Sequence, residues 1–187
     1  MKKTWNQFYK QRGRFYLQPH PSIDKIINKF MDYRVKRVLD LGCGSGRHCI
    51  RLAKSDFKMI GMDFSKESLK LAKRWAKKEK LKIKFITGDI HKKIPFNRKL
   101  FDGILAIDSL HYDTIEALEF TLNESKRVLK NKGIIFITLP TQICNPLMTH
   151  LIFSKEEIVN LVSKHFKIID KFLDKRNFLC VFGLHKN

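Results

Sequence analysis

The hydrophobic positions of the chain follow two alternating periods, one typical of strands and one typical of helices. Apolar runs of strand length lie at positions 36–41, 58–64, 82–87, 101–107 and 133–139. In the stretches between them, apolar residues recur with helical spacing at 22–31, from the glycine-rich turn to about 53, after Ser65, and at 114–129. Two final strand-like runs, 166–173 and 178–184, are joined by the turn-like sequence DKRN.

This order of elements predicts an α/β fold, with an open, mostly parallel sheet and helices on both faces. Parallel strands need helical crossovers, which the helical stretches supply, whereas the short final turn makes one strand antiparallel. Two helix starts carry capping signals, because Ser65 stands at an N-cap position and Ser154 with Glu157 forms a capping box. Ligands of such sheets bind at the carboxyl ends of the strands, so the candidate site residues are expected there.

The composition fits a single soluble domain over residues 1–187. Hydrophobic residues make up 43% and charged residues 30% of the chain, which is a globular balance, and the apolar runs are far too short to cross a bilayer. The basic stretch MKKTWNQFYKQRGRF lacks an apolar segment and a cleavage site, so we expect no signal peptide, no membrane contact and a cytoplasmic location. The cysteines form no CxxC pair, so we expect reduced thiols and no metal at Cys43, Cys49, Cys144 and Cys180.

The stretch VLDLGCGSGRH places three glycines between a strand and a helix. Gly42, Gly44 and Gly46 have the spacing G-x-G-x-G, whereas the dinucleotide fingerprint has its third glycine one residue later. Glycines permit a left-handed backbone and the close approach of a ligand. Asp40, just before the turn, is unfavourable beside a pyrophosphate but suits a cationic amine. No G-K-[ST] sequence follows, which excludes a Walker-type phosphate loop.

Two further acids lie where the next two strands end. Asp63 ends the second strand about twenty residues after the turn, where a carboxylate can accept both hydroxyls of an unphosphorylated ribose. Asp89, in the sequence TGDI, follows the third strand. It either accepts a hydrogen bond from an adenine amino group, with Ile90 against the ring, or is a simple turn residue.

Five segments together resemble the class I S-adenosylmethionine-dependent methyltransferases, over about residues 35–139: VLDLGCGSGRH, GMDFS, GDI, FDGILAIDSLHY and ESKRVLKNKGIIFIT. The resemblance implies a Rossmann-like, seven-stranded sheet with an antiparallel last strand and S-adenosyl-L-methionine over the first two strand ends. It gives the methionine part to Asp40 and residues 42–46, the ribose to Asp63 and the adenine to Asp89. The cofactor residues that it implies are Asp40, Gly42, Cys43, Gly44, Gly46, Asp63, Phe64, Asp89, Ile90 and Asp108.

The sequence AIDSLHY ends the fourth strand, which faces the methyl group in this family. It lacks both the Asn/Asp-Pro-Pro-aromatic motif of enzymes that methylate exocyclic amines and the Pro-Cys of 5-methylcytosine enzymes. His111 is a candidate catalytic base, because its unperturbed pKa lies near neutrality, or it packs beside the cofactor. Asp108 either orients the acceptor or caps the following element. Methyl transfer needs mainly in-line positioning, so no catalytic motif is obligatory.

Two segments outside the sheet are available to close an acceptor pocket, residues 1–21 and residues 140–153. The first interleaves aromatic and basic side chains. It forms either a lid, with an Arg that pairs the cofactor carboxylate, or a helix that packs on the sheet edge. Its candidate lid residues are Trp5, Tyr9, Arg14 and Tyr16. The second segment is irregular by pattern.

The chain is strongly basic, with 38 Lys and Arg against 18 Asp and Glu and a net charge of +20. Lysines gather between positions 66 and 84, whereas the charged residues of 101–125 are all acidic. The leading hypothesis is methylation of a small molecule, neutral or cationic because of these acids, and GSGRH is commonest among family members with small-molecule acceptors. The alternatives are an RNA (tRNA) methyltransferase, which the net charge favours, and a non-catalytic cofactor-binding partner subunit.

Overall fold

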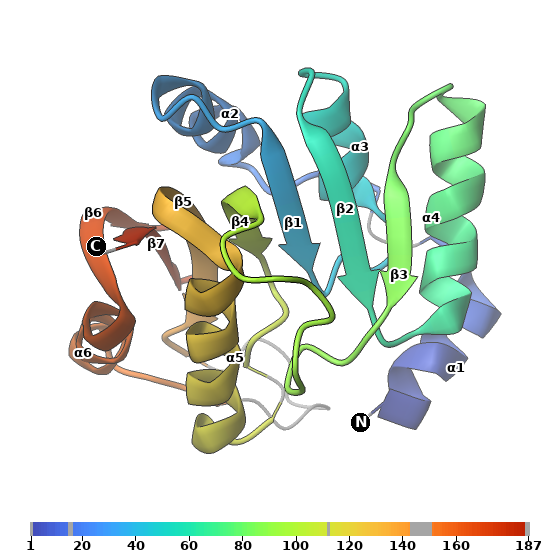
Figure 1. Ribbon diagram of the computed structural model, residues 1–187. Coiled ribbons are helices and arrows are strands. Elements are labelled where there is room, and N and C mark those ends of the chain that lie inside the picture. The colour runs from blue at the N-terminus through green and yellow to red at the C-terminus, as the bar shows by residue number, and fades with distance from the viewer. Residues whose placement is uncertain (1, 15–16, 112, 143–150, 186–187) are drawn as a thin grey trace.

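The protein is built on one seven-stranded sheet, seen in a computed structural model that describes residues 2–14, 17–111, 113–142 and 151–185. The strand order is β3-β2-β1-β4-β5-β7-β6, and only the two pairs that include β7 are antiparallel (Figure 1). The α/β fold and its antiparallel strand are therefore confirmed. The strands are β1 (Arg37–Leu41), β2 (Lys58–Asp63), β3 (Lys84–Thr87), β4 (Phe101–Ala106), β5 (Leu129–Pro140), β6 (Phe166–Leu173) and β7 (Phe178–His185).

Helices cover both faces of the sheet, and each face has its own core. The helices are α1 (Lys2–Arg12), α2 (Ile23–Asp32), α3 (Arg47–Ala53), α4 (Lys66–Lys78), α5 (Ile115–Val128) and α6 (Lys155–His165). Successive residues of a strand point to opposite faces. Val38 of β1 accordingly joins the core under α2, α3 and α4, whereas Leu39 and Leu41 join the core under α5 and α6.

The capping signals in the sequence are present in the structure. The Ser65 hydroxyl accepts the backbone N–H of Ser68 at 3.1 Å and so begins α4. At the start of α6, the Ser154 hydroxyl accepts the N–H of Glu157 at 3.1 Å, and the Glu157 carboxylate accepts the N–H of Ser154 at 2.7 Å. These contacts satisfy amide groups that a helix start leaves unpaired, which is why the helices begin at these residues.

Strand β5 begins earlier than the apolar pattern predicts. The pattern places its start at position 133, but Leu129 already pairs with Phe101 of β4, after which the register shifts. Residues 130–132 are polar and lie in this irregularity, and Lys132 has a left-handed φ of 60°. An irregular, polar stretch inside a strand breaks the hydrophobic run, so the pattern finds only the buried part.

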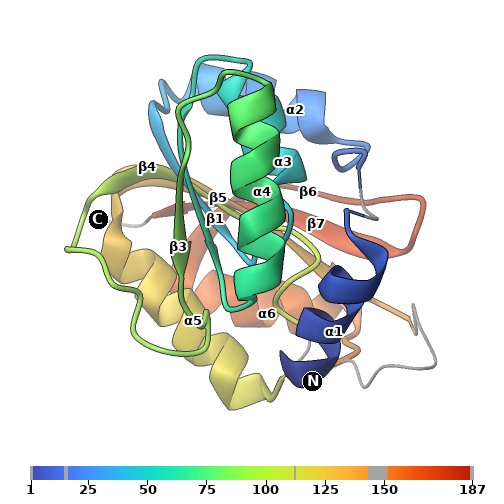
Figure 2. The ribbon, with the colours of Figure 1, turned by 90° about the vertical axis from the view of Figure 1, so that its right-hand side faces the viewer.

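The carboxyl ends of the parallel strands meet at one edge of the sheet, and α1 lies beside that edge. Figures 1 and 2 show α1 next to one end of α4, against which it packs, close to the ends of β2 and β3. The fold thus brings the first segment of the chain to the edge where the sequence places a ligand. Among the described residues, no helix has the length and apolar character needed to span a bilayer.

Candidate cofactor and acceptor site

The glycine turn lies between the ends of β1 and β2. The backbone N–H of Gly42 donates to the Met62 carbonyl of β2 at 2.8 Å. Gly42 and Gly44 have φ values of 71° and 53°, which residues other than glycine rarely adopt. A Cβ at Gly42 would lie 2.5 Å from the Cβ of Ser109, and a Cβ at Gly44 would overlap the Tyr9 hydroxyl. Glycine is therefore required at both positions by backbone conformation and by space.

Asp63, at the end of β2, ties this turn to the start of α4. Its carboxylate is buried and accepts the backbone N–H groups of Gly44 and Ser65, each at 2.8 Å. Burial raises the pKa of Asp63, and the hydrogen bonds from Ser65 and Gly44 oppose the rise. A carboxylate has about four acceptor sites. Asp63 therefore retains acceptor capacity for the ribose hydroxyls that the sequence predicts there.

Asp40 and two cysteines form a buried group beneath the turn. Asp40 is 1% exposed, and the Cys49 thiol donates to its Oδ2 at 3.2 Å. Burial raises the pKa of Asp40 to about 7, against the opposite effects of Cys49 and of the Arg47 charge. Burial also raises the pKa of the Cys43 thiol to about 11, which leaves it unreactive at neutral pH. The described cysteines are free thiols, as expected: Cys43, Cys49 and Cys180.

Three further expected cofactor residues, Phe64, Asp89 and Ile90, lie just after β2 and β3. Phe64 is half-buried and Ile90 is buried. Asp89 is half-buried, and its Oδ1 accepts the backbone N–H of His91 at 3.1 Å. That contact is the short turn that an Asp side chain commonly makes. The structure thus shows the turn role of Asp89, and its adenine contact stays a prediction.

Asp108 follows β4 and is held by two arginines from distant parts of the chain. Arg47 Nη2 lies 2.8 Å from its Oδ2, while Arg176 Nη1 and Nη2 lie 2.9 and 3.2 Å from Oδ2 and Oδ1. Its backbone has a left-handed φ of 54°, and its N–H donates to the Thr138 hydroxyl at 2.9 Å. Burial would raise the pKa of Asp108, but Arg176 and Arg47 outweigh that effect and lower the pKa to about 2. The carboxylate is ionised and its charge is compensated.

Arg176 lies in the turn between β6 and β7 and is itself firmly anchored. Its Nε and Nη2 also donate to Asp174 Oδ2 at 2.9 and 2.7 Å, and its guanidinium lies 4.7 Å from the centroid of the Phe178 ring. Hydrogen bonds to two carboxylates fix the plane of a guanidinium. Arg176 was not among the residues expected from the sequence, because 68 residues separate it from Asp108 and only the DKRN turn marks it.

His111, the candidate base, is buried at the same edge. It is 1% exposed, and its ring meets the Phe178 ring edge-on with the centroids 5.4 Å apart. Its carbonyl accepts the N–H of Leu151 at 2.9 Å. The structure therefore shows a packing role for His111. Its role as a catalytic base stays a prediction.

Arg47 and His48, the last letters of GSGRH, connect the glycine turn to the N-terminal segment. Arg47 Nη1 donates to the Gln18 carbonyl at 3.2 Å, and the backbone N–H of His20 donates to His48 Nε2 at 3.2 Å. Burial and the Arg47 charge hold the pKa of His48 well below its usual value, so its ring is a neutral acceptor. Residue spacing gave no sign of these tertiary contacts.

His20, Asp174 and Cys180 bring three possible metal-ligand atoms within 4.8 Å of one another. The hydrogen bonds favour another arrangement. The N–H of Ser22 donates to His20 Nδ1 at 3.1 Å, so Nε2 carries the ring proton and donates to Asp174 Oδ2, also at 3.1 Å. Arg176 already compensates the Asp174 charge. The cluster is therefore a hydrogen-bonded pair beside a buried thiol, with no ring nitrogen left for a cation.

The N-terminal segment both forms a helix and covers the glycine turn. The Tyr9 hydroxyl lies directly over Gly44, and the Ser65 hydroxyl donates to Asn6 Oδ1 at 2.7 Å. The Trp5 ring lies beside the Tyr9 ring, with centroids 6.2 Å apart. The structure thus shows a packed helix over the glycine turn, and its role as a lid over cofactor and acceptor stays a prediction.

For two expectations about the lid segments, the described residues give no supporting contact. The Arg14 guanidinium lies 4.5 Å from the centroid of the Trp75 ring on α4, and the pairing of an Arg of this segment with a cofactor carboxylate stays a prediction. Tyr16 and residues 143–150 of the second lid segment lie outside the described residues. In the described part of that segment, Phe153 is buried.

We expect Gly44→Ala to displace α1 from the glycine turn. The new methyl group would overlap the Tyr9 hydroxyl, and the left-handed backbone would cost a further ~1–2 kcal/mol. Limited proteolysis within α1 should therefore be faster in the variant. Adding Tyr9→Phe removes the overlap and should return the cleavage rate to that of Tyr9→Phe alone. Equal cleavage of Gly44→Ala with and without Tyr9→Phe would contradict this account.

The chain matches a family model described as a methyltransferase domain over residues 34–179. A ubiquinone biosynthesis O-methyltransferase of Pelagibacter ubique is 33% identical over 101 residues, which are 54% of this chain and 40% of that protein. The chain spans 40–62% of the length of the curated relatives that it matches first.

Solved structures share the fold at lower identity. The PH0226 protein of Pyrococcus horikoshii has a TM-score of 0.77 at 22% identity, covering 88% of each chain. The 1,6-didemethyltoxoflavin-N1-methyltransferase of Burkholderia thailandensis, crystallised with S-adenosylhomocysteine, has a TM-score of 0.80 at 18% identity, covering 100% of this chain and 87% of its own. These likenesses establish the fold.

Proposed function

The chain belongs to the methyltransferase-domain family, and on this premise we propose that it transfers a methyl group from S-adenosylmethionine to a small-molecule acceptor. The observation that carries the proposal is the row of acids and glycines at the carboxyl edge of a sheet matched by the family model. Two similar proteins support the small-molecule part, one named for ubiquinone biosynthesis and one solved with 1,6-didemethyltoxoflavin and S-adenosylhomocysteine. Methyltransferases of this family use S-adenosylmethionine, and the acids and glycines of this edge suit that cofactor.

The residues at this edge suit the cofactor by their chemistry. Gly42 and Gly44 have left-handed backbone conformations and no room for a Cβ, so their bare backbone faces the site. Asp63 keeps free acceptor sites for hydroxyl groups, and Asp40 is a buried acid that a nearby cationic amine would favour in its ionised form. We assign the ribose to Asp63, the methionine part to Asp40 and the turn, and the adenine to Asp89, with Phe64 and Ile90 beside it.

When bound, the cofactor supplies a reactive sulfonium methyl, so the protein's task is mainly to orient the acceptor and exclude water. Arg47 and Arg176 fix the Asp108 carboxylate in one position and keep it ionised. His111 lies nearby in the chain and is the candidate group for removing a proton from a hydroxyl acceptor. We place the acceptor between these residues and the two lid segments, 1–21 and 140–153.

The structure changes the expected charge of the acceptor. The acids after β4 favoured a neutral or cationic acceptor, but two arginines compensate Asp108, the acid nearest the strand end. The attraction for a cation is thereby reduced, and we propose a neutral acceptor. An RNA acceptor gains no support from the relatives. We also propose a cytoplasmic location, since the cysteine pattern suits reduced thiols.

The test is incubation with methyl-labelled S-adenosylmethionine and a fractionated cell extract. We expect label in the small-molecule fraction and none in RNA. Label confined to RNA would replace this proposal with the RNA alternative. Tight binding of S-adenosylhomocysteine with no labelled fraction would instead indicate the non-catalytic partner subunit. In a positive fraction, His111→Ala should lower kcat and leave the affinity for S-adenosylhomocysteine unchanged if His111 is the base.

A further inference from the structure

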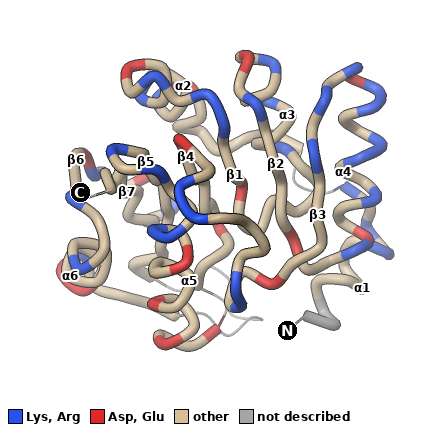
Figure 3. The backbone as a smooth tube through the Cα atoms, viewed as in Figure 1, with Lys and Arg blue, Asp and Glu red and all other residues tan. Residues whose placement is uncertain are grey.

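Lysines stand at the start of the parallel strands, and the topology gathers them on one edge of the sheet. Parallel strands begin at the same edge, which we call the amino edge and which lies opposite the candidate cofactor site. Figure 3 shows Lys and Arg at the starts of several neighbouring strands. The exposed lysines at or just before strand starts, or in the irregular first part of β5, are Lys36, Lys58, Lys84, Lys99, Lys130, Lys132 and Lys167.

The acids at the amino edge compensate only part of this charge. Asp102 pairs with Lys130 at 2.7 Å, and Glu79 pairs with Lys54 at 2.6 Å. Asp32 and Asp56 are the other acids near strand starts, and both are exposed. By contrast, Arg34, Lys132 and Lys167 form no ion pair within the described part of the chain. The amino edge is therefore strongly positive.

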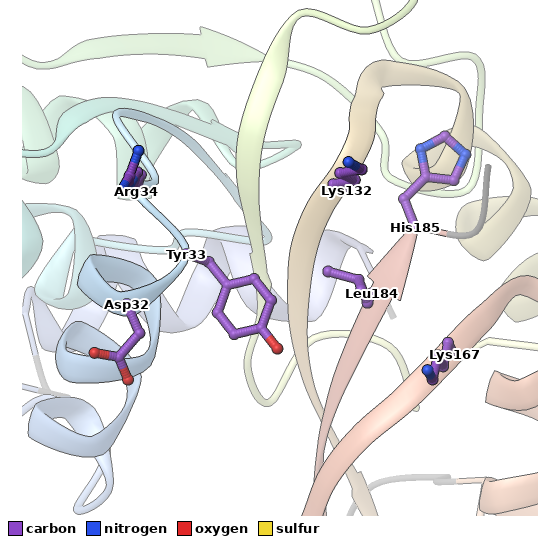
Figure 4. A pocket seen from close by; sticks show the side chains of 7 residues that line it. All are labelled: Asp32, Tyr33, Arg34, Lys132, Lys167, Leu184 and His185. Carbon is purple, nitrogen blue, oxygen red and sulfur yellow. The ribbon is translucent and has the colours of Figure 1, made fainter.

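A groove of about 580 Å³ opens at this edge between the α2–β1 turn and strands β5, β6 and β7. Figure 4 shows the Tyr33 ring directed toward Leu184, with Arg34 on one side and Lys132 and Lys167 on the other. Tyr33 is 39% exposed, so its ring is accessible to a ligand in the groove. The remaining lining residues are Asp32 and His185.

We propose that this groove binds single-stranded nucleic acid, with a base on Tyr33 and the phosphates on the flanking cations. A basic groove with an exposed aromatic ring is the arrangement that holds single strands without sequence preference. Neighbouring strands lie about 4.8 Å apart, so the lysines form a row that can follow a phosphate backbone beyond the groove. A membrane would also attract the charge, but cations on both sides of an aromatic ring in a groove fit a single strand better than a flat surface.

The proposed contact is separate from methyl transfer. The five residues of β1 alone put about 17 Å between the amino edge and the glycine turn. A nucleic acid on the amino edge is therefore bound by the protein without being placed at the reacting methyl. The proposal goes beyond the proposed function, and neither depends on the other.

The test is fluorescence anisotropy with a labelled oligouridylate of about ten nucleotides, at salt concentrations between about 50 and 200 mM. The groove variant is Arg34→Gln/Lys132→Gln/Lys167→Gln. A matched control, Lys73→Gln/Arg74→Gln/Lys77→Gln, removes the same number of positive charges from exposed residues of α4, which does not line the groove. We expect the groove variant to bind at least tenfold more weakly with a smaller salt dependence, and the control to change less than threefold.

Tyr33→Leu separates stacking from charge, since it keeps the net charge and should weaken binding by about tenfold. Unchanged affinity for S-adenosylhomocysteine in every variant would show that the cofactor edge is intact. Equal weakening by the groove and control triples would overturn the proposal in favour of general electrostatic attraction. It would also be overturned if the groove triple lost binding to vesicles of anionic phospholipid while its affinity for the oligouridylate stayed unchanged.

Discussion

Asp63→Ala should weaken binding of S-adenosylmethionine by about a hundredfold or more. The substitution removes the acceptors expected for the ribose, and each hydrogen bond to a charged group contributes about 1.5–3 kcal/mol. It also leaves the buried N–H groups of Gly44 and Ser65 without their acceptor, so the glycine turn loses its tie to α4. Calorimetric titration with S-adenosylmethionine measures the loss. Affinity within a factor of three of wild type would refute the assignment of Asp63.

Asp102→Ala is the matched control for this experiment. Asp102 also accepts two backbone N–H groups, those of Lys36 and Arg37, at 3.2 and 2.8 Å, but it lies at the opposite edge of the sheet. Its removal should lower the free energy of unfolding while leaving cofactor affinity unchanged. A comparable loss of affinity in both variants would mean that general destabilisation, and not the lost ribose acceptor, explains Asp63→Ala.

In the cofactor-free protein, Asp40→Asn should remove a pH-dependent loss of folding stability. Burial raises the pKa of Asp40 from 3.8 to about 7. Between these values the unfolded chain is ionised and the folded chain holds a proton, so the contribution of Asp40 to stability falls as pH rises toward 7. At 1.36 kcal/mol per pKa unit, this contribution is about 3 kcal/mol less favourable at pH 8 than at about pH 5.

Urea unfolding of wild type and Asp40→Asn at the two pH values tests this expectation. The difference in unfolding free energy between variant and wild type should shift in favour of the variant by about 3 kcal/mol from pH 5 to pH 8. Comparing the two pH values cancels any fixed cost of the new amide group. A difference that does not change with pH would contradict the raised pKa. The same variant should bind the cofactor more weakly, because it lacks the acid that we assign to the methionine part.

Most of the fold could be predicted because its determinants are local. The apolar run of β1 supplies both cores, as Val38 and Leu39 show, and the run itself is visible without coordinates. Ser65 and Ser154 fix helix starts through hydrogen bonds that span three residues. The start of β5 was missed because its first residues are polar and irregularly paired, so they carry no hydrophobic signal.

The positions of the candidate cofactor residues were predictable for a related reason. In a parallel sheet every strand ends at the same edge, so an acid at a strand end lies at the edge where ligands of such sheets bind. Asp40 and Asp63 could be placed in this way, and both are buried at that edge. The amino-edge lysines follow the same rule at the opposite end of the strands. The groove beside Tyr33, on which the nucleic-acid proposal depends, is seen only in the structure.

The sequence by itself determined the α/β fold, the glycine turn and the acids around it, because each depends on residues close together in the chain or on the direction of the strands. Only the tertiary structure decided how Asp108 is held, where α1 lies and what His111 contacts. Arg176 reaches Asp108 across 68 residues, and Tyr9 covers Gly44 through the packing of α1 on α4. Such contacts depend on the docking of whole elements, for which no local pattern of residues gives a signal.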